Sequence, residues 1–404
     1  MAEPASAMTR LGPEDARRMR LALAEAARGR GAVEPNPMVG AAIFDGDRLV
    51  ALGNHSLYGG PHAEIEAIST ATASKEDLRG MTIHVTLEPC CHQGKTPPCT
   101  DAILRAGFAR VVVATLDPFP LVSGGGVSRL RAAGVQVDQW SADSEIAAEA
   151  VALNRPFFKR VLTGRPYVIA KWAMSLDGRI ALPSGDSRWI SNGRSRALVH
   201  ELRGRVDAVI VGIGTALADD PSLTARPPGP RVPFRVVVDP KAELPAASRL
   251  VRTARETPLR IYCAAEADCK RVDILAAGGC EVVPLDADVN GTISPDAILD
   301  HLGRTGATNV LVEGGSRLLG RFFDSAAIDE VQAFLAPALF GGNLAFAPIV
   351  GHFEPVMENV PRLESVRRFE IGDDTLIVGD VPSEWMRLLL RNLKESSHGK
   401  TDLE

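Results

Sequence analysis

The chain has 404 residues, enough for two or three domains, and its apolar fraction of 45% and charged fraction of 24% are typical of a globular protein. Its net charge of −5 argues against a protein that binds nucleic acid, because such proteins carry a basic excess. Six cysteines suit a reducing cytoplasm rather than a disulfide framework, and no apolar run fits a signal peptide or a membrane span, so we expect a cytoplasmic protein without a membrane partner.

The first part of the chain alternates between helical and extended patterns. Residues 14–30 place Ala16, Met19 and Leu23 at helical spacing, and residues 38–44 and 48–54 form a predicted hairpin around Asp45-Gly46-Asp47. Further elements are expected at 62–73 (helix), 81–87 (strand), 100–106 (helix), 110–116 (strand) and 144–159 (helix). This alternation predicts an α/β sandwich.

A second α/β pattern follows a predicted linker at residues 163–166. Strands are expected at 167–174, 208–212, 235–239, 259–264, 281–285 and 309–313, and Ser294 should cap a helix that runs to residue 301. Residues 385–404 favour a short amphipathic helix before a polar end. We therefore predict domains at 1–160 and 161–382, with a polar C-terminal tail at 383–404.

The stretch between His62 and Cys99 has the pattern of a catalytic zinc site. His62 and Glu64 open a predicted helix, and Pro89, Cys90 and Cys99 follow later in the chain. One imidazole and two thiolates leave the fourth tetrahedral position of a zinc ion open for water, as in catalytic rather than structural sites. Zinc lowers the pKa of that water to about 7. A carboxylate two residues from the histidine would then carry the proton.

This order of residues is the signature of zinc deaminases that act on nucleobases. The usual second half is Pro-Cys-x-x-Cys, whereas here eight residues separate Cys90 from Cys99, and Cys91 and His92 lie between them as rival ligands. An alternative is a structural zinc module on a non-catalytic ligand-binding domain. That alternative is disfavoured because a closed site would need a fourth ligand.

The second half has a weaker nucleotide-binding pattern. The predicted strand at 309–313 is followed by Gly314, Gly315 and Ser316, so free amides at the start of a helix could hold a phosphate. Gly212 and Gly214 do not complete a Gly-x-Gly-x-x-Gly motif, which disfavours a standard dinucleotide fold. The remaining cysteines have no metal-site spacing and are expected to be buried thiols: Cys263, Cys269 and Cys280.

Residues 90–99 resemble the long loop in the deaminase half of the bifunctional riboflavin-biosynthesis deaminase-reductases. The second half is similar to the reductase half of that family at Met174-Ser175-Leu176-Asp177-Gly178, Gly185-Asp186-Ser187-Arg188-Trp189-Ile190, Gly214-Thr215-Ala216-Leu217-Ala218-Asp219-Asp220-Pro221 and Glu313-Gly314-Gly315. The similarity covers about residues 14–380. It implies a cytidine-deaminase-like α/β/α sandwich followed by a dihydrofolate-reductase-like α/β domain, with Zn²⁺ and NADPH as cofactors.

The resemblance also implies roles for individual residues. His62, Cys90 and Cys99 would bind zinc, and Glu64 would be the catalytic proton carrier. The cofactor would contact Ala173, Trp189, Thr215, Asp219, Gly315, Ser316, Arg317, Leu318, Leu319, Gly320 and Arg321. Substrate would contact Lys171, Ser187, Arg203, Leu223, Arg226 and Glu313 in the reductase half, and Asn36, His55, His92, Lys95 and Asp117 in the deaminase half. Arginine pairs suit a phosphate, because guanidinium groups make bidentate contacts.

The sequence departs from the family after Asp117-Pro118. The family usually has Asn-Pro-Leu-Val and then Ala-Gly-Arg-Gly, whereas this chain has Phe119 and Ser123-Gly124-Gly125-Gly126. A polar contact and a phosphate-facing arginine are therefore missing. We expect weaker phosphate recognition in the first site.

The resemblance implies hydrolytic deamination of 2,5-diamino-6-ribosylamino-4(3H)-pyrimidinone 5′-phosphate. NADPH would then reduce the ribosyl group of 5-amino-6-(5-phosphoribosylamino)uracil to ribityl. We expect this small phosphorylated aminopyrimidine as the substrate, no nucleic-acid partner, and a homo-oligomer. The alternative is a nucleic-acid-editing zinc deaminase with a non-catalytic, RNA-binding C-terminal domain, which the acidic charge balance disfavours.

Overall fold

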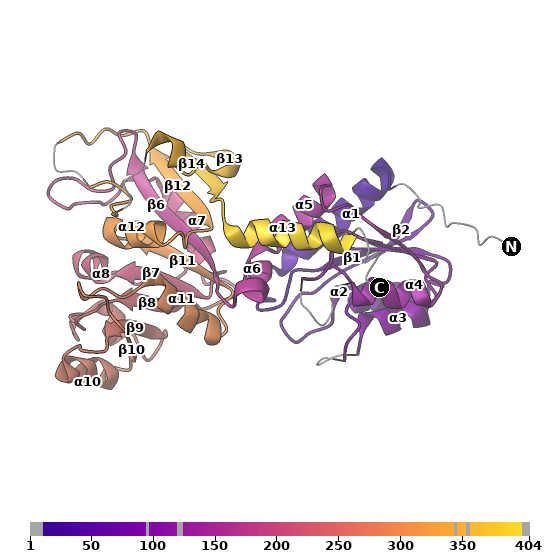
Figure 1. Cartoon of the computed structure of the whole chain (residues 1–404), viewed down its shortest axis with the longest axis horizontal. Helices are drawn as coiled ribbons and strands as arrows, with labels where there is room; N and C mark the ends of the chain where they lie inside the picture. The colour runs from indigo at the N-terminus through magenta and orange to yellow at the C-terminus, as the bar shows by residue number, and fades with distance from the viewer. Residues whose placement is uncertain (1–10, 94–96, 119–123, 343–345, 353–355, 398–404) are drawn as a thin grey trace. The chain divides into compact units, whose positions relative to one another are not determined.

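The computed structural model describes the chain except residues 1–10, 94–96, 119–123, 343–345, 353–355 and 398–404 (Figure 1). It forms two compact units, one from Met1–Thr163 and Trp385–Glu404 and the other from Gly164–Glu384. Both units are α/β, which confirms the predicted fold class. Within the described residues, none of the helices combines the length and the apolar character needed to cross a bilayer.

The first unit is built on a five-stranded sheet in the order β2-β1-β3-β4-β5, in which β3, β4 and β5 are parallel. Its strands are β1 (Gly40–Asp45), β2 (Arg48–Asn54), β3 (Thr82–Val85), β4 (Arg110–Val113) and β5 (Gln136–Gln139). The helices are α1 (Pro13–Ala26), η1 (Ala27–Gly29), α2 (Ala63–Ala73), α3 (Cys99–Ala106), α4 (Gly125–Ala132), α5 (Glu145–Leu153) and α6 (Arg155–Thr163). The predicted β1–β2 hairpin is confirmed.

Two details of this unit differ from the prediction. The helix expected at 144–159 is two helices that break at Asn154, whose side chain accepts from the amide of Met38 at 2.8 Å and donates to its carbonyl at 2.9 Å. Helix α4 and strand β5 were not predicted, because the glycines at 124–126 and 134 obscure the periodic pattern.

Buried side chains of α1, β1, β4 and α5 pack together as a core that includes Met19, Phe44, Val112 and Ile146.

The second unit contains a nine-stranded sheet in the order β10-β9-β8-β7-β11-β6-β12-β14-β13, antiparallel only in the last two pairings. Its strands are β6 (Tyr167–Ser175), β7 (Ala208–Gly212), β8 (Phe234–Val238), β9 (Leu259–Ala264), β10 (Glu281–Leu285), β11 (Asn309–Gly314), β12 (Glu330–Ala336), β13 (Glu364–Ile371) and β14 (Asp374–Asp380). The helices are α7 (Gly193–Arg203), α8 (Ile213–Asp219), α9 (Arg249–Arg252), α10 (Cys269–Ala277), α11 (Pro295–Arg304), α12 (Ser316–Asp324) and η2 (Met357–Asn359).

The six strands predicted in this half are all present, and Ser294 caps α11 by accepting from the amide of Asp296 at 3.2 Å. Strands β12, β13 and β14 were not predicted. Cys263 and Cys280 are buried as expected, but the expectation is wrong for Cys269, which is exposed because it begins the surface helix α10.

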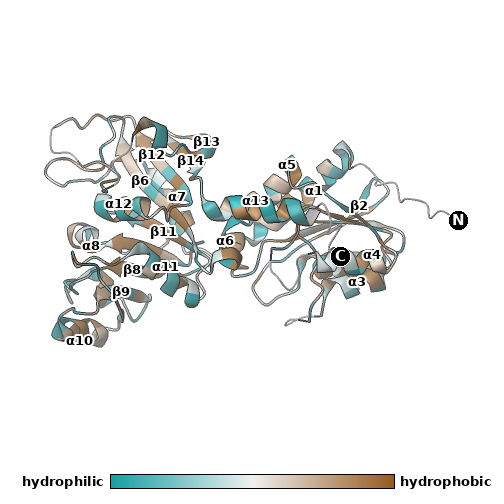
Figure 2. Ribbon diagram, viewed as in Figure 1, coloured by the Kyte–Doolittle hydropathy of each residue, from teal (hydrophilic) through white to brown (hydrophobic). Residues whose placement is uncertain are grey.

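Residues 384–397, inside the segment predicted as a polar tail, form helix α13 (Glu384–Ser397). Polar and apolar residues alternate along it with helical spacing (Figure 2). Its apolar stripe is buried: Trp385 is 8%, Leu389 0% and Leu393 5% exposed, and Lys394 pairs with Asp143 at 2.7 Å. The helix thus belongs to the first unit, although the chain reaches it only after completing the second.

Candidate functional site

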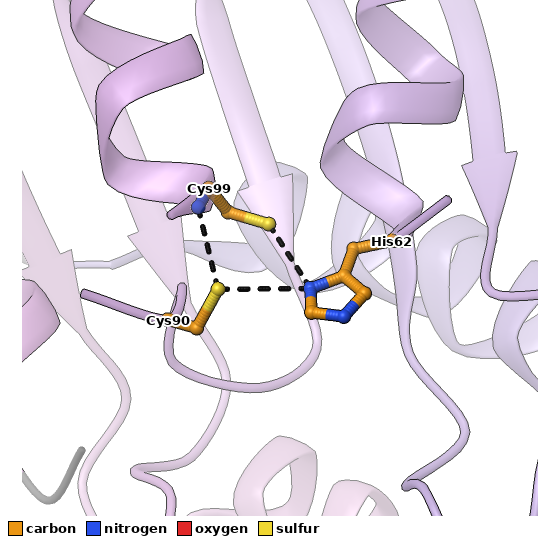
Figure 3. Close-up of side chains that lie close together, drawn as sticks. All are labelled: His62, Cys90 and Cys99. Carbon is orange, nitrogen blue, oxygen red and sulfur yellow. Dashed lines mark hydrogen bonds between the residues drawn. The ribbon is translucent and has the colours of Figure 1, made fainter. Parts of the chain in front are cut away.

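His62, Cys90 and Cys99 converge in the first unit, with their ligand atoms within 4.8 Å of one another (Figure 3). The Nδ1 atom of His62 lies 3.2 Å from the sulfur of Cys99 and 3.6 Å from that of Cys90. In the part of the chain that the structure describes, this is the one group of three such residues. Cys91 and His92, the rival ligands in the sequence, are not members of it.

Local backbone structure holds the three side chains in place. His62 is the N-cap of α2 and Cys99 is the first residue of α3, so both lie at helix starts, as predicted. Cys90 lies in the loop after β3, where its carbonyl accepts from the amide of Thr100 at 3.2 Å and its sulfur accepts from the amide of Cys99 at 3.3 Å. Hydrogen bonds from Cys99 and His62 lower the pKa of Cys90, which favours the thiolate that a metal ion needs.

Glu64 lies in the first turn of α2 and is only 3% exposed. Burial, together with the negative charge of Cys90, raises its pKa to about 7. A carboxyl group with such a pKa gains and loses a proton near neutral pH, which suits a general acid and base. The donor set of one imidazole and two thiolates fits a zinc ion with one open position.

Asn36 and His55 lie beside this cluster. His55 donates through Nδ1 to the carbonyl of Pro61 at 2.8 Å and accepts through Nε2 from the amide of Asn36 at 3.1 Å. Burial lowers its pKa and so favours the neutral ring, whose centre is 5.5 Å from that of His62. Of the other predicted substrate contacts in this half, Asp117 and His92 are described, whereas Lys95 lies outside the described residues.

Glu88 was not among the predicted site residues. Its buried carboxylate accepts from the backbone amides of Gly124 at 2.8 Å, Val127 at 3.0 Å and Asp117 at 3.4 Å. It therefore supplies the N-terminal cap of α4 that Gly124 cannot supply from its own side chain. Because Glu88 is two residues from Cys90, it links the metal-binding loop to the segment that carries Asp117. The one sequence signal that could have identified Glu88 is its position directly before Pro89-Cys90.

The second unit contains a cavity of about 1230 Å³ at the carboxyl ends of its parallel strands. Most of the residues predicted for this half line it: Lys171, Ala173, Ser187, Trp189, Arg203, Thr215, Asp219, Leu223, Arg226, Glu313, Gly315, Ser316, Arg317, Leu318, Leu319 and Arg321. Gly320, also among the described residues, does not line it. A Cβ atom at Gly320 would meet the carbonyl oxygen of Val350 at 2.0 Å, so this glycine serves close packing.

A buried ion pair lies in this cavity. Arg203, at the end of α7, makes two hydrogen bonds of 2.6 Å to the two carboxylate oxygens of Glu313, at the carboxyl end of β11. Burial alone would raise the pKa of Glu313, but Arg203 and Lys171 outweigh it and hold the carboxylate below its ordinary value. Burial lowers the pKa of Lys171, and the charge of Arg203 adds to this effect. The site therefore presents a fixed carboxylate beside an amine that loses its proton more readily than an exposed lysine.

The start of α12 forms the second feature of the cavity. Gly315 has φ +82°, a conformation that glycine adopts without strain, and a Cβ atom there would lie 3.1 Å from the hydroxyl of Thr215. Among the described residues, no side chain caps this helix. Its first amides are therefore available to an anionic ligand, and the helix dipole favours one.

Two cavity residues were missed by the sequence reasoning. His200 accepts through Nε2 from Arg226 at 3.3 Å and donates through Nδ1 to the carbonyl of Thr224 at 3.1 Å. Arg196 stacks on the ring of Trp189, which is 72% exposed, at 4.5 Å. Both residues lie on α7, and their spacing from Arg203 places them within two turns of it.

Comparisons with known proteins agree with this architecture. Residues 13–115 match the model of the cytidine and deoxycytidylate deaminase zinc-binding region, and residues 166–377 match that of the RibD C-terminal domain. The riboflavin biosynthesis protein RibD of Actinobacillus pleuropneumoniae is 38% identical over 359 residues, which are 89% of this chain and 93% of that protein. RibD of Aquifex aeolicus is 40% identical over 332 residues, or 82% of this chain and 89% of that protein.

Solved structures are similar over almost the whole chain. The crystal structure of a diaminohydroxyphosphoribosylaminopyrimidine deaminase/5-amino-6-(5-phosphoribosylamino)uracil reductase from Thermotoga maritima has a TM-score of 0.78 and 36% identity. The match covers 91% of this chain and 98% of the Thermotoga maritima chain. Acinetobacter baumannii RibD also has a TM-score of 0.78, at 32% identity. That match covers 92% of this chain and 99% of the Acinetobacter baumannii chain.

Fold and sites together define a bifunctional enzyme, a zinc-dependent deaminase joined to an NADPH-dependent reductase. The chain belongs to the RibD family of riboflavin-biosynthesis deaminase-reductases. Its function is accordingly deamination and reduction in riboflavin biosynthesis, as the resemblance implied. The alternative of a nucleic-acid-editing deaminase is not favoured, because the second half matches a reductase domain.

Proposed function

We propose that this chain deaminates 2,5-diamino-6-ribosylamino-4(3H)-pyrimidinone 5′-phosphate in its first unit. It then reduces the ribosyl group of 5-amino-6-(5-phosphoribosylamino)uracil in its second. The observation that carries the proposal is the convergence of His62, Cys90 and Cys99 beside the buried Glu64. The Thermotoga maritima protein, which is named for both activities, supports the same substrates.

In the deaminase site, His62, Cys90 and Cys99 hold the zinc ion, which supplies an activated water molecule at neutral pH when bound. Glu64, buried in the first turn of α2 two residues after His62, would accept a proton at its carboxylate and deliver it to the departing amine. Asn36, His55, His92, Lys95 and Asp117 bind the substrate. The pair formed by Asn36 and His55 offers fixed polar groups beside the metal ligands.

In the reductase site, NADPH supplies a hydride when bound. Residues 315–319 and Arg321, in the first two turns of α12, hold the cofactor together with the side chains of Thr215, Asp219, Trp189 and Ala173. Lys171, Ser187, Arg203, Leu223, Arg226 and Glu313 hold the phosphorylated substrate. The Arg203–Glu313 pair supports the assignment of Glu313 to the substrate, because two hydrogen bonds hold its carboxylate in one orientation.

We also propose that the enzyme is a cytoplasmic homo-oligomer. Its six cysteines are free, and two of them must stay reduced to bind zinc, which a reducing compartment ensures. Strand β13 lies at an edge of the nine-stranded sheet, and most of its residues, including Phe369, are exposed. An exposed edge of this kind pairs readily with another chain. Analytical ultracentrifugation tests this part, since a monomer at micromolar concentration contradicts it.

The direct test uses the full-length protein with the diaminopyrimidine phosphate and NADPH, following ammonia release and NADPH oxidation separately. We expect ammonia without NADPH, and NADPH oxidation only after deamination or when the deaminated uracil phosphate is supplied. Release of ammonia from a nucleic acid but not from the pyrimidine phosphate would contradict the proposed substrate.

A further inference from the structure

The cavity of the second unit is strongly cationic. Eight arginine or lysine side chains line it, against three carboxylates. Four of the seven arginines have partners: Arg203 pairs with Glu313, Arg188 with Asp219, Arg226 contacts His200, and Arg196 stacks on Trp189. Within the described part of the chain, the guanidinium groups of Arg249, Arg317 and Arg321 have no such partner. These three are therefore available to anionic groups of a ligand.

The order of the strands indicates what each end of the cavity binds. Strands β6, β11, β7 and β8 are parallel neighbours, so their carboxyl ends follow one another along one edge of the sheet. Lys171 and Glu313 come from β6 and β11, where substrate is reduced in the proposed function. The start of α12 directly follows β11 and suits the pyrophosphate of a dinucleotide.

The adenosine end of the cofactor then extends toward β8. Two strand spacings of about 4.8 Å separate β11 from β8, or about 10 Å. At this end the lining becomes apolar, with Val238, Pro240, Ile293 and Ile298. Such side chains suit the faces of an adenine ring.

Arg249 lies at this end, because α9 follows β8 in the chain. It lines the cavity and is exposed, and its backbone amide donates to Asp220 at 2.7 Å. That bond joins the start of α9 to Asp220, the C-cap residue of α8, and it occupies one oxygen of the Asp220 carboxylate. A guanidinium group held here is placed to meet a phosphate on the adenosine ribose.

We propose that Arg249 selects a 2′-phosphorylated nicotinamide dinucleotide over its unphosphorylated form. The inference rests on the proposed reductase function and adds to it the residue that reads the 2′-phosphate. Arg317 has a different role. As the second residue of α12, it lies at the helix start assigned above to the pyrophosphate, which both forms of the cofactor share.

The test measures binding, without turnover, in full-length protein. Dissociation constants are determined by calorimetry for NADPH, NADH, adenosine 2′,5′-bisphosphate and adenosine 5′-monophosphate. The variants are Arg249→Gln, Arg249→Lys, Arg317→Gln and a matched control, Arg252→Gln, on the same helix as Arg249. Arg252 is also exposed but does not line the cavity. Circular dichroism confirms that each variant is folded.

We expect Arg249→Gln to weaken NADPH and the bisphosphate about tenfold or more, because a charge-assisted hydrogen bond is lost. Binding of NADH and the monophosphate should change less than about twofold, Arg249→Lys should recover part of the loss, and Arg252→Gln should match wild type. Equal weakening of NADPH and NADH by Arg249→Gln, or no weakening, overturns the assignment. So does a loss confined to NADPH in Arg317→Gln. If wild-type protein binds none of the nucleotides, the reductase function itself fails.

Discussion

Arg203 and Glu313 face each other through two hydrogen bonds of 2.6 Å, although 110 positions separate them in the chain. Their side chains are only 15% and 6% exposed. Removing one partner of such a pair leaves an uncompensated buried charge. We therefore expect Glu313→Ala to lower the free energy of unfolding of the second unit by about 3–5 kcal/mol, measured by urea denaturation.

The same pair predicts a pH dependence of stability. The pKa of Glu313 is held below its ordinary value of 4.5, so the folded carboxylate binds fewer protons than the unfolded one. Its contribution is fully present above pH 4.5 and is lost as the pH falls through the lower folded pKa. Glu313→Gln should therefore flatten the decline in stability on the acid side. An unchanged slope would show that other carboxylates cause the decline.

Glu64→Gln should retain zinc and the fold but lose deamination, because an amide is nearly the same shape as the carboxyl group and cannot carry its proton. Reduction of the deaminated substrate should continue. Zinc content, ammonia release and NADPH oxidation are measured on the same preparation. Deamination within a few fold of wild type would remove Glu64 from its proposed role.

Zinc content should distinguish the neighbouring cysteines. Cys99→Ser should release zinc, since its sulfur lies 3.2 Å from His62 Nδ1, and Cys91→Ser should keep it. The two variants make the same chemical change, so Cys91→Ser is the matched control. Loss of zinc from Cys91→Ser with retention in Cys99→Ser would reverse the ligand assignment.

The double substitution Gly125→Arg and Phe119→Asn introduces the residues that the family has at these positions. It should lower KM for the diaminopyrimidine phosphate with little change in kcat, because the added contacts bind the phosphate and not the reacting atoms. Phe119 lies outside the described residues. Gly125 begins α4, and a Cβ atom there would lie 3.0 Å from the sulfur of Cys91, so that side chain must move slightly. Gly125→Ala tests the cost of that movement alone. An unchanged KM in the double variant would mean that the phosphate is already bound by other groups.

Helix α13 should contribute to the stability of the deaminase unit. Leu389 is fully buried, whereas its neighbour Leu388 is 41% exposed. Leu389→Ala should lower the free energy of unfolding of the first unit by about 2–5 kcal/mol, and Leu388→Ala should change it by less than about 0.5 kcal/mol. Equal effects of the two substitutions would contradict the packing of this helix.

Local sequence patterns predicted the elements that have strong periodicity, such as the β1–β2 hairpin and strands β7 and β9. They failed where structure depends on distant residues. Strand β13 is largely exposed, so it lacks an apolar pattern, and its place in the sheet depends on pairing with β14. The break at Asn154 likewise depends on Met38, 116 positions away.

The same distinction holds for the sites. His62, Glu64, Cys90 and Cys99 could be found because metal chemistry restricts both residue type and order. Glu88 and His200 act through backbone amides and a neighbouring guanidinium, and such contacts leave no spacing pattern in the sequence. The guanidinium group of Arg249 has no partner among the residues that the structure describes, and that depends on how the other cavity arginines pair.

Helix α13 has a consequence for the order in which the enzyme matures on the ribosome. The deaminase unit is made first, yet the helix that covers part of it is translated after all of residues 164–384. At about 5–20 residues per second, the intervening segment takes roughly 10–45 s to synthesise. During that interval the surface of the first unit that buries Trp385, Leu389 and Leu393 stays exposed to solvent and to other nascent chains. The half of the enzyme that begins first is therefore completed last.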